Sequence, residues 1–222
     1  MAGVRTVPLS HNKVRLALHQ LSDHPGRPLL LLHGLGEHTP LEVPAEAAAW
    51  PGPVWGLDFT GHGRSTIPRG GGYTCELLMA DTDVALAHLG EATLYGRGLG
   101  GYVALLAAGA RPGGVRGVVI DDGPGLAGGD SRPSTVVITT VERDEADSAP
   151  PDPFALRELS RDVRPPDYAA SFAREAVEQS GLEAPLVVSA TERPPWLAAV
   201  VERYGTEVRP VEAALARFAA SP

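Results

Sequence analysis

The chain has 222 residues, of which 43% are apolar, and its formal net charge is −8 at pH 7. This length fits one domain, or a core domain with a small insertion, and allows a sizeable buried core. The acidic balance and the absence of a Lys/Arg cluster argue against nucleic acid and membrane as partners. A single cysteine and an N-terminus without an apolar stretch predict a cytoplasmic protein.

Strands and helices alternate along the first half of the chain. Apolar and polar residues alternate over 14–18, as in a half-buried strand, and residues 29–32 are all leucine, which is typical of a strand covered on both faces. The predicted elements of this half are strands over 14–18, 29–32 and 54–57 and helices over 41–50 and 74–89. Thr74 is the predicted N-cap of the last helix and Gly90 its end.

The second half begins with the same alternation and then departs from it. Its predicted elements are strands from residue 92 and over 115–120, 185–190 and 206–209, and helices over 99–110, 154–159, 168–180, 196–204 and 211–220. Such alternation predicts an α/β protein with a mostly parallel sheet flanked by helices. Residues 125–184 break the pattern, so we predict a core of 1–124 and 185–222 and a small lid insertion over 125–184.

Three segments resemble the α/β-hydrolase fold family. Residues 30–36 (LLLHGLG) are similar to the strand and turn of its oxyanion hole, and residues 58–65 (DFTGHGRS) to its D-x-x-G-H-G-x-S loop. Residues 96–100 (GRGLG) lie between a predicted strand and a predicted helix, as does the nucleophile elbow G-x-S-x-G. The order and spacing of these segments match the family, so the resemblance implies an α/β-hydrolase fold.

The catalytic chemistry of that family requires a serine, a histidine and a carboxylate. Gly98 stands where the resemblance places the serine, and no histidine follows His88. In the turn after the strand over 185–190, Arg193 stands at the expected acid position and Glu192 next to it, while some family members place the acid where Asp121 and Asp122 lie. The sequence therefore predicts a pseudo-hydrolase with no intact catalytic residue and only the vestigial position Gly98.

Ligand binding remains open in this prediction. The oxyanion donors implied by the resemblance are the backbone amides of Leu35 and Leu99, which side-chain changes do not delete. We expect the crevice to bind a small ligand or a protein partner, with homo-oligomerisation possible. The alternative is an unconventional enzyme, a carbonyl-directed lyase or isomerase or an atypical hydrolase, which uses the same amides with Asp122 or Glu192 as acid or base.

Further ligand-binding candidates are weighed against structural roles. Arg97 and Arg193 favour a carboxylate or phosphate ligand if they line the crevice, but pairing with a local acid is the preferred interpretation. Asp122 is equally compatible with turn chemistry and with pocket lining. Tyr168 follows a rigid polar turn and either contributes to the pocket from the lid or belongs to an ordered surface loop.

Several other reactive side chains are predicted to be structural. These are His33, His62 and Ser65 in loops near the site, Asp58 bonding amides of its own turn, and Cys75 as an inert thiol. No group of residues has the spacing of metal ligands. Residues 96–101 match a dinucleotide fingerprint, but their place late in the sheet favours the elbow. No cofactor is therefore predicted.

Overall fold

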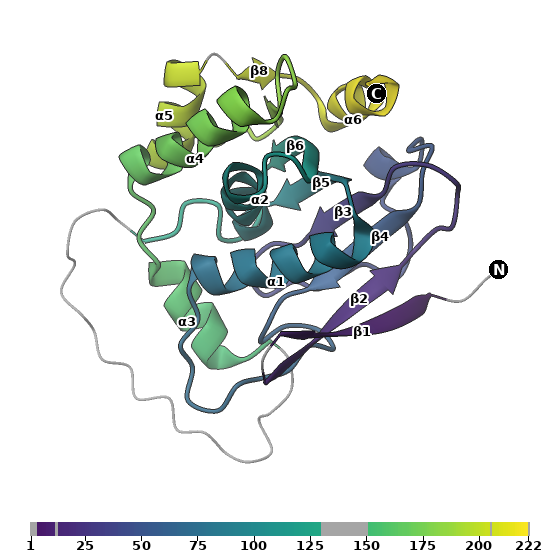
Figure 1. Ribbon diagram of the computed structural model, residues 1–222. Coiled ribbons are helices and arrows are strands. Elements are labelled where there is room, and N and C mark those ends of the chain that lie inside the picture. The colour runs from purple at the N-terminus through teal and green to yellow at the C-terminus, as the bar shows by residue number, and fades with distance from the viewer. Residues whose placement is uncertain (1–3, 12, 130–150, 205, 222) are drawn as a thin grey trace.

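A computed structural model describes residues 4–11, 13–129, 151–204 and 206–221 (Figure 1). Its strands are β1 (Arg5–His11), β2 (Val14–Gln20), β3 (Leu29–Leu32), β4 (Val54–Asp58), β5 (Ala92–Arg97), β6 (Val115–Asp121), β7 (Leu186–Val188) and β8 (Glu207–Val208). Its helices are η1 (Ala45–Ala47), α1 (Cys75–Leu89), α2 (Leu99–Ala110), α3 (Pro153–Arg161), α4 (Pro166–Gln179), α5 (Pro195–Tyr204) and α6 (Val211–Ala220). The α/β class predicted from the sequence is confirmed.

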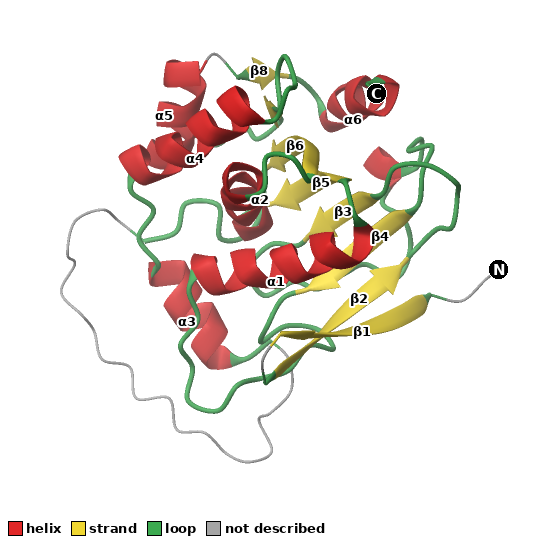
Figure 2. Cartoon of the chain, viewed as in Figure 1, coloured by secondary structure: helices red, strands yellow, loops and turns green. Residues whose placement is uncertain are grey.

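The strands form one sheet of eight in the order β1-β2-β4-β3-β5-β6-β7-β8 (Figure 2). The pairs from β4 to β8 are parallel, whereas β2 is antiparallel to both β1 and β4. Because parallel strands all end at the same edge, the loops after β3, β4, β5 and β6 meet there. This carboxyl edge carries the three motifs found in the sequence.

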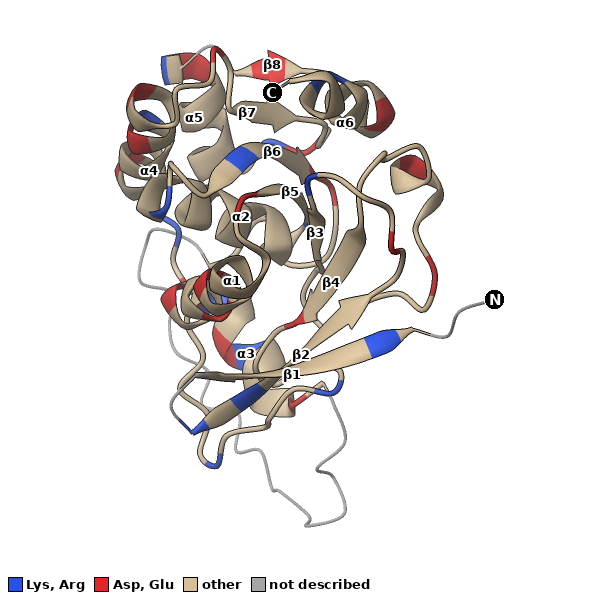
Figure 3. Cartoon of the chain, turned by 45° about the vertical axis from the view of Figure 1, so that its right-hand side comes forward, with Lys and Arg blue, Asp and Glu red and all other residues tan. Residues whose placement is uncertain are grey.

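Two apolar clusters cover the two faces of the sheet. One face packs against α1, α2, α4 and α5 and contains most of the buried leucines of the central strands. The other face packs against η1 and α6, with Phe218 among its fully buried side chains. Charged residues lie mainly on the helices, the loops and the strand ends (Figure 3). Burial on both faces explains why the central strands are continuous apolar runs.

Two predicted elements are corrected by the structure. The sequence reading placed no strand before residue 14, yet residues 5–11 form β1, an edge strand whose alternate residues Pro8 and Ser10 are exposed. An edge strand buries only part of one face, so its apolar periodicity is weak. The helix predicted over 41–50 is only the short 3-10 helix η1, because Pro44 and Pro51–Pro53 confine it.

The region predicted as a lid contains two helices among its described residues. Helix α4 packs on α2, where the backbone of Phe172 lies against Gly109, and its buried residues are alanines. Helix α3 lies over the loops at the carboxyl edge, where Glu158 accepts hydrogen bonds from the amides of Gly72 and Tyr73. Residues 130–150 lie outside the described residues, and the boundaries 125–184 stay a prediction. No helix in the described ranges is long and apolar enough to cross a membrane.

Candidate functional site: a filled nucleophile elbow

Gly98 forms the sharp turn between β5 and α2. Its φ of 53° and ψ of −118° lie in the region that L-residues rarely adopt. Gly96, two residues earlier, lies so close to the backbone of Gly100 that a Cβ at position 96 would overlap the Gly100 carbonyl. The strand and the helix are therefore joined as tightly as in a nucleophile elbow, which confirms the predicted strand–turn–helix context.

The volume beside Gly98 is filled by the protein's own backbone. A Cβ at position 98 would overlap the carbonyl oxygen of Pro124 and the carbonyl of Gly123. The amide of Gly98 also donates to the carbonyl of Asp121 at 3.0 Å. The segment Gly123–Leu126, which we call the plug, thus lies where the side chain of a nucleophile would stand.

The plug also occupies the two amides predicted as oxyanion donors. The N–H groups of Leu35 and Leu99 both donate to the carbonyl oxygen of Pro124, at 2.9 and 3.0 Å. The two amides converge on one oxygen, as donors of an oxyanion hole do. That oxygen, however, belongs to the chain itself. The expectation that these amides point into an open crevice is therefore wrong, because buried backbone donors are satisfied by the nearest acceptor.

Two side chains donate hydrogen bonds to carbonyl groups of the plug. The buried guanidinium of Arg164 donates to the carbonyls of Gly125 and Leu126 and lies over the ring of Tyr102, with Cζ 4.7 Å from the ring centroid. The indole N–H of Trp196 donates to the same Leu126 carbonyl at 2.9 Å. Main-chain groups, a cation and an aromatic ring thus all stabilise this position of the plug.

An open cavity of about 520 Å³ lies beside the filled elbow. We call it the elbow cavity; its lining includes Leu31, Leu32 and Tyr95 as apolar surface and His33, Glu37 and Arg97 as polar groups. Arg97 donates through two nitrogens to the Glu37 carboxylate, and the shorter distance is 3.0 Å. This contact agrees with the preferred sequence interpretation, in which Arg97 pairs with a local acid. Burial raises the pKa of Glu37, but the contacts with Arg97 and the Gly34 amide lower it below the ordinary value.

The carboxylates of Asp121 and Asp122 both accept hydrogen bonds from groups of the protein itself. Asp122 accepts from the amides of Thr191 and Glu192 at 2.7 and 3.0 Å, and Asp121 accepts from the hydroxyl of Tyr95 at 2.9 Å. Both contacts tie neighbouring strand ends together. Of the two interpretations of Asp122, turn chemistry is the one these contacts describe.

The remaining candidates lie apart from the elbow cavity. The guanidinium of Arg193 donates to the carbonyl of the adjacent Glu192, at 3.2 Å on the exposed surface. Tyr168, on α4, stacks edge-on against Phe172. Of the seven ligand-binding candidates, only Arg97 lines the elbow cavity.

Two buried histidines serve the loops, as predicted. His33 is 6% exposed; its Nδ1 contacts the carbonyl of Gly34, and its Nε2 accepts from the amide of Phe59. Burial and the neighbouring His62 lower the pKa of His33 to about 4, so its imidazole is neutral at pH 7. Burial likewise lowers the pKa of His62. Both rings contact backbone groups of the loops.

Ser65 and Cys75 also have structural roles. The hydroxyl of Ser65 donates to the carbonyl of Asp58 and accepts from the amide of Ala17, so it joins two strands. Cys75 is buried, and burial raises the pKa of its thiol far above the ordinary value. Both observations agree with the sequence interpretation. The described residues contain no group of three or more His, Cys, Asp or Glu that could hold a metal ion.

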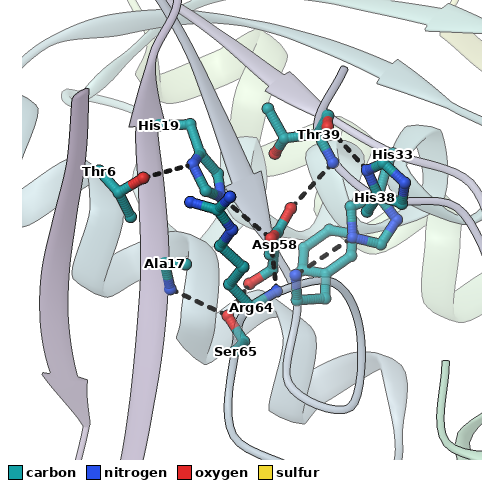
Figure 4. A network of polar contacts seen from close by, with 10 residues as sticks. Thr6, Ala17, His19, His33, His38, Thr39, Asp58, Arg64 and Ser65 are labelled. Atoms are coloured by element: carbon teal, nitrogen blue, oxygen red, sulfur yellow. Dashed lines mark hydrogen bonds and ion pairs between the residues drawn. The ribbon is translucent and has the colours of Figure 1, made fainter. Parts of the chain in front are cut away.

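Sequence reasoning missed a polar chain on β1, β2 and β4 (Figure 4). The Oγ1 of Thr6 lies 3.0 Å from Nδ1 of His19, and Nε2 of His19 lies 3.0 Å from Oδ2 of Asp58. Asp58 also accepts from the amide of Arg64 in its own turn, as predicted. The contact between His19 and Asp58 could not be predicted, because it depends on how β2 pairs with β1 and β4, and no sequence motif indicates that pairing.

Comparisons with known proteins agree with the fold. Residues 29–221 match the model of the alpha/beta hydrolase family. No curated protein matches the chain. Among solved structures, the hypothetical protein PA1622 of Pseudomonas aeruginosa is similar at 18% identity and a TM-score of 0.66, over 98% of this chain and 99% of that one.

Two further solved structures are similar over nearly the whole chain. The N-formylmaleamic acid deformylase Nfo of Pseudomonas putida has 14% identity and a TM-score of 0.66, over 94% of this chain and 92% of its own. The thioesterase domain from the curacin biosynthetic pathway has 15% identity and a TM-score of 0.62, with coverages of 99% and 98%. At these identities the likeness shows the fold.

Proposed function

The chain belongs to the alpha/beta hydrolase family, and we propose that it is a member without hydrolase chemistry at its elbow, which binds a small molecule in the neighbouring elbow cavity. The observation that carries this proposal is the carbonyl of Pro124, which accepts both oxyanion amides while the plug fills the space of the nucleophile. A substrate carbonyl and Pro124 cannot bond to the same two amides at once.

The missing side chains support the same conclusion. Gly98 has no nucleophile, and the chain has no histidine after His88, where the family's base would lie. Loss of a serine or histidine from a hydrolase triad costs on the order of 10⁶ in turnover. The alternative, a lyase or isomerase that polarises a carbonyl with Leu35 and Leu99, would first have to displace the plug.

The ligand class follows from the lining of the elbow cavity. Its volume suits a small organic molecule, and its floor is apolar. Of the three Asp, Glu, Lys or Arg residues on its lining, Arg97 and Glu37 already neutralise each other, and Glu46 is exposed. A charged ligand would have to break that pair and leave one partner uncompensated, which is unfavourable. We therefore expect an uncharged, largely apolar ligand.

Two measurements test this proposal. The Gly98→Ser variant should hydrolyse p-nitrophenyl acetate no faster than the parent chain does, because no base is in place. Ligand-observed NMR with a set of uncharged aromatic fragments should find binders that Glu46→Trp excludes, since Glu46 is an exposed residue on the lining of the elbow cavity.

A matched control and the contrary outcomes complete the test. Glu42→Trp adds the same bulk at an exposed residue outside the lining and should leave fragment binding unchanged. A gain of ester turnover in Gly98→Ser would refute the inactive elbow. Fragments that bind equally to parent and Glu46→Trp would refute the elbow cavity as the site.

A further inference from the structure

A second cavity, of about 380 Å³, lies beside the β1–β2 hairpin. We call it the hairpin cavity; His19, Asp58 and Arg64 are among its lining residues. Its border is apolar in part, because Val4 and Leu41 are also on the lining and their exposed fractions are 39% and 74%. Apolar surface beside convergent polar groups is typical of a small-molecule site.

The strand register brings a hydroxyl to the same place. Thr6 pairs directly with His19 across the antiparallel strands β1 and β2. Side chains alternate between the faces of a strand, and Leu16 and Leu18 belong to the cluster that packs against the helices. His19 therefore points to the opposite face, together with Thr6 and Val4. Thr6 is not itself on the lining of the hairpin cavity, but its hydroxyl lies 3.0 Å from His19, which is.

The hydrogen bonds of Asp58 orient the imidazole. Burial raises the pKa of Asp58, but the bonds from His19 and from the amides of Arg64 and Thr39 lower it well below the ordinary range. An ionised carboxylate can only accept, so Nε2 of His19 carries the hydrogen in this contact. With Nε2 facing Asp58, the other ring nitrogen, Nδ1, faces the Thr6 hydroxyl oxygen at 3.0 Å, and in the tautomer without a hydrogen on Nδ1 it accepts from that hydroxyl.

We propose that Thr6 is a nucleophile for acyl transfer from small apolar esters, with His19 as its base and Asp58 as the residue that positions the imidazole. The Thr6 oxygen attacks the ester carbonyl carbon while its proton passes to Nδ1 of His19. The alcohol then leaves with that proton, and an acyl-threonine ester remains. Water hydrolyses this ester through the same base, which restores the hydroxyl and releases the acid. A hydroxyl, an imidazole and a carboxylate in hydrogen-bonded series is the arrangement that activates such nucleophiles.

Arg64 supplies positive charge at this site. Its amide donates to Asp58 at 2.8 Å, and Arg64 lines the hairpin cavity together with His19. A guanidinium in this position can stabilise the negative charge that develops on the ester oxygen. The role of Arg64 is independent of the elbow, whose amides are occupied by Pro124.

The test is acylation of the full chain by p-nitrophenyl acetate, read by mass spectrometry with the modified residue mapped. Mapping is essential, because Lys13 and the terminal amine also react with such esters. We expect acetyl on Thr6 in the parent chain and none at position 6 in Thr6→Val, which keeps the shape and strand preference of the residue. His19→Gln should slow acylation of Thr6 by about 100-fold or more, the usual contribution of a positioned base.

The conservative variant and the control separate a nucleophile from a structural hydrogen bond. Thr6→Ser should be acylated at least as fast as the parent, because its hydroxyl is less hindered. Ser10→Ala removes an exposed hydroxyl of the same strand and should leave acylation of Thr6 unchanged. Absence of acetyl on Thr6 in the parent chain, or an equal rate in His19→Gln, would overturn the proposal. Gly98→Ser reports on the elbow alone, so the two proposals can fail separately.

Discussion

Two polar sites lie side by side at the carboxyl edge of the sheet, and both cavities are lined by residues 36–40. At the elbow, the polar groups are backbone amides, and a backbone carbonyl satisfies them. At the hairpin cavity, the polar groups are side chains, and His19 on its lining contacts both Asp58 and the Thr6 hydroxyl. The difference shows that an elbow with glycine at its turn need not be vacant, because its buried amides bond to an internal acceptor.

The largest expected effect tests whether the plug fills the elbow. Gly98 and Gly90 have similar backbones, with φ of 53° and 81° and ψ of −118° and −133°. A Cβ at position 90 meets nothing within 4 Å, whereas one at position 98 overlaps the plug. Gly90→Ala should cost about 1–2 kcal/mol for backbone strain alone. Gly98→Ala should cost about 4 kcal/mol, since overpacking adds roughly 1–3 kcal/mol.

Chemical denaturation of the two variants measures this difference. Circular dichroism establishes first that both variants are folded, and Gly90→Ala serves as the matched control for backbone strain. Equal losses of unfolding free energy in the two variants would mean that the plug moves away from the added Cβ without further destabilisation. The elbow would then be an open site that the plug covers only loosely.

A pH titration probes the loops between the two cavities. The pKa of His33 falls from 6.5 to about 4 on folding, because burial and His62 oppose its charge. The unfolded chain binds this proton more tightly than the folded chain does. The contribution of neutral His33 to the unfolding free energy is therefore fully present above pH 6.5. It is lost as the pH falls from 6.5 to 4, and the loss is up to about 3 kcal/mol.

The unfolding free energy of the parent and of His33→Asn across this window checks the assignment. The variant should be less stable at pH 7, because Phe59 loses an acceptor for its amide. It should also show a smaller slope between pH 6.5 and 4. An unchanged slope would assign the acid sensitivity to other groups, His62 among them.

Arg164 offers a way to loosen the plug without touching the elbow. Arg164→Met removes the donors to the carbonyls of Gly125 and Leu126. Two lost hydrogen bonds correspond to about 2 kcal/mol. Hydrogen exchange of the Leu35 and Leu99 amides should then become faster, because their acceptor, Pro124, belongs to the same segment. Arg111→Met, which breaks an exposed pair with Asp83, should change neither amide. Unchanged exchange in Arg164→Met would mean that the plug does not depend on this clamp.

The sequence predicts the strands and the turn around this site better than the contacts made within it. The all-leucine run 29–32 and the glycines around position 98 predict the strands and the turn, because periodicity and steric freedom are local properties. The plug depends on where the backbone of Gly123 and Pro124 lies in space, and in the sequence these residues indicate only a turn. The partner of His19 depends on the register of β1, an edge strand with a weak pattern. A single sequence predicts local structure, whereas it does not predict contacts between distant segments.

The smallest expected effect concerns Asp122, which the sequence left between turn chemistry and pocket lining. Its carboxylate accepts from the amides of Thr191 and Glu192 on the surface, so Asp122→Ala should lower the unfolding free energy by about 1 kcal/mol. Fragment binding in the elbow cavity should not change, because Asp122 is not on its lining. Asp83→Ala, which removes an exposed ion-pair carboxylate, should cost less than this. Unaltered stability together with altered fragment binding would return Asp122 to the binding site and make the elbow and its surroundings one connected pocket.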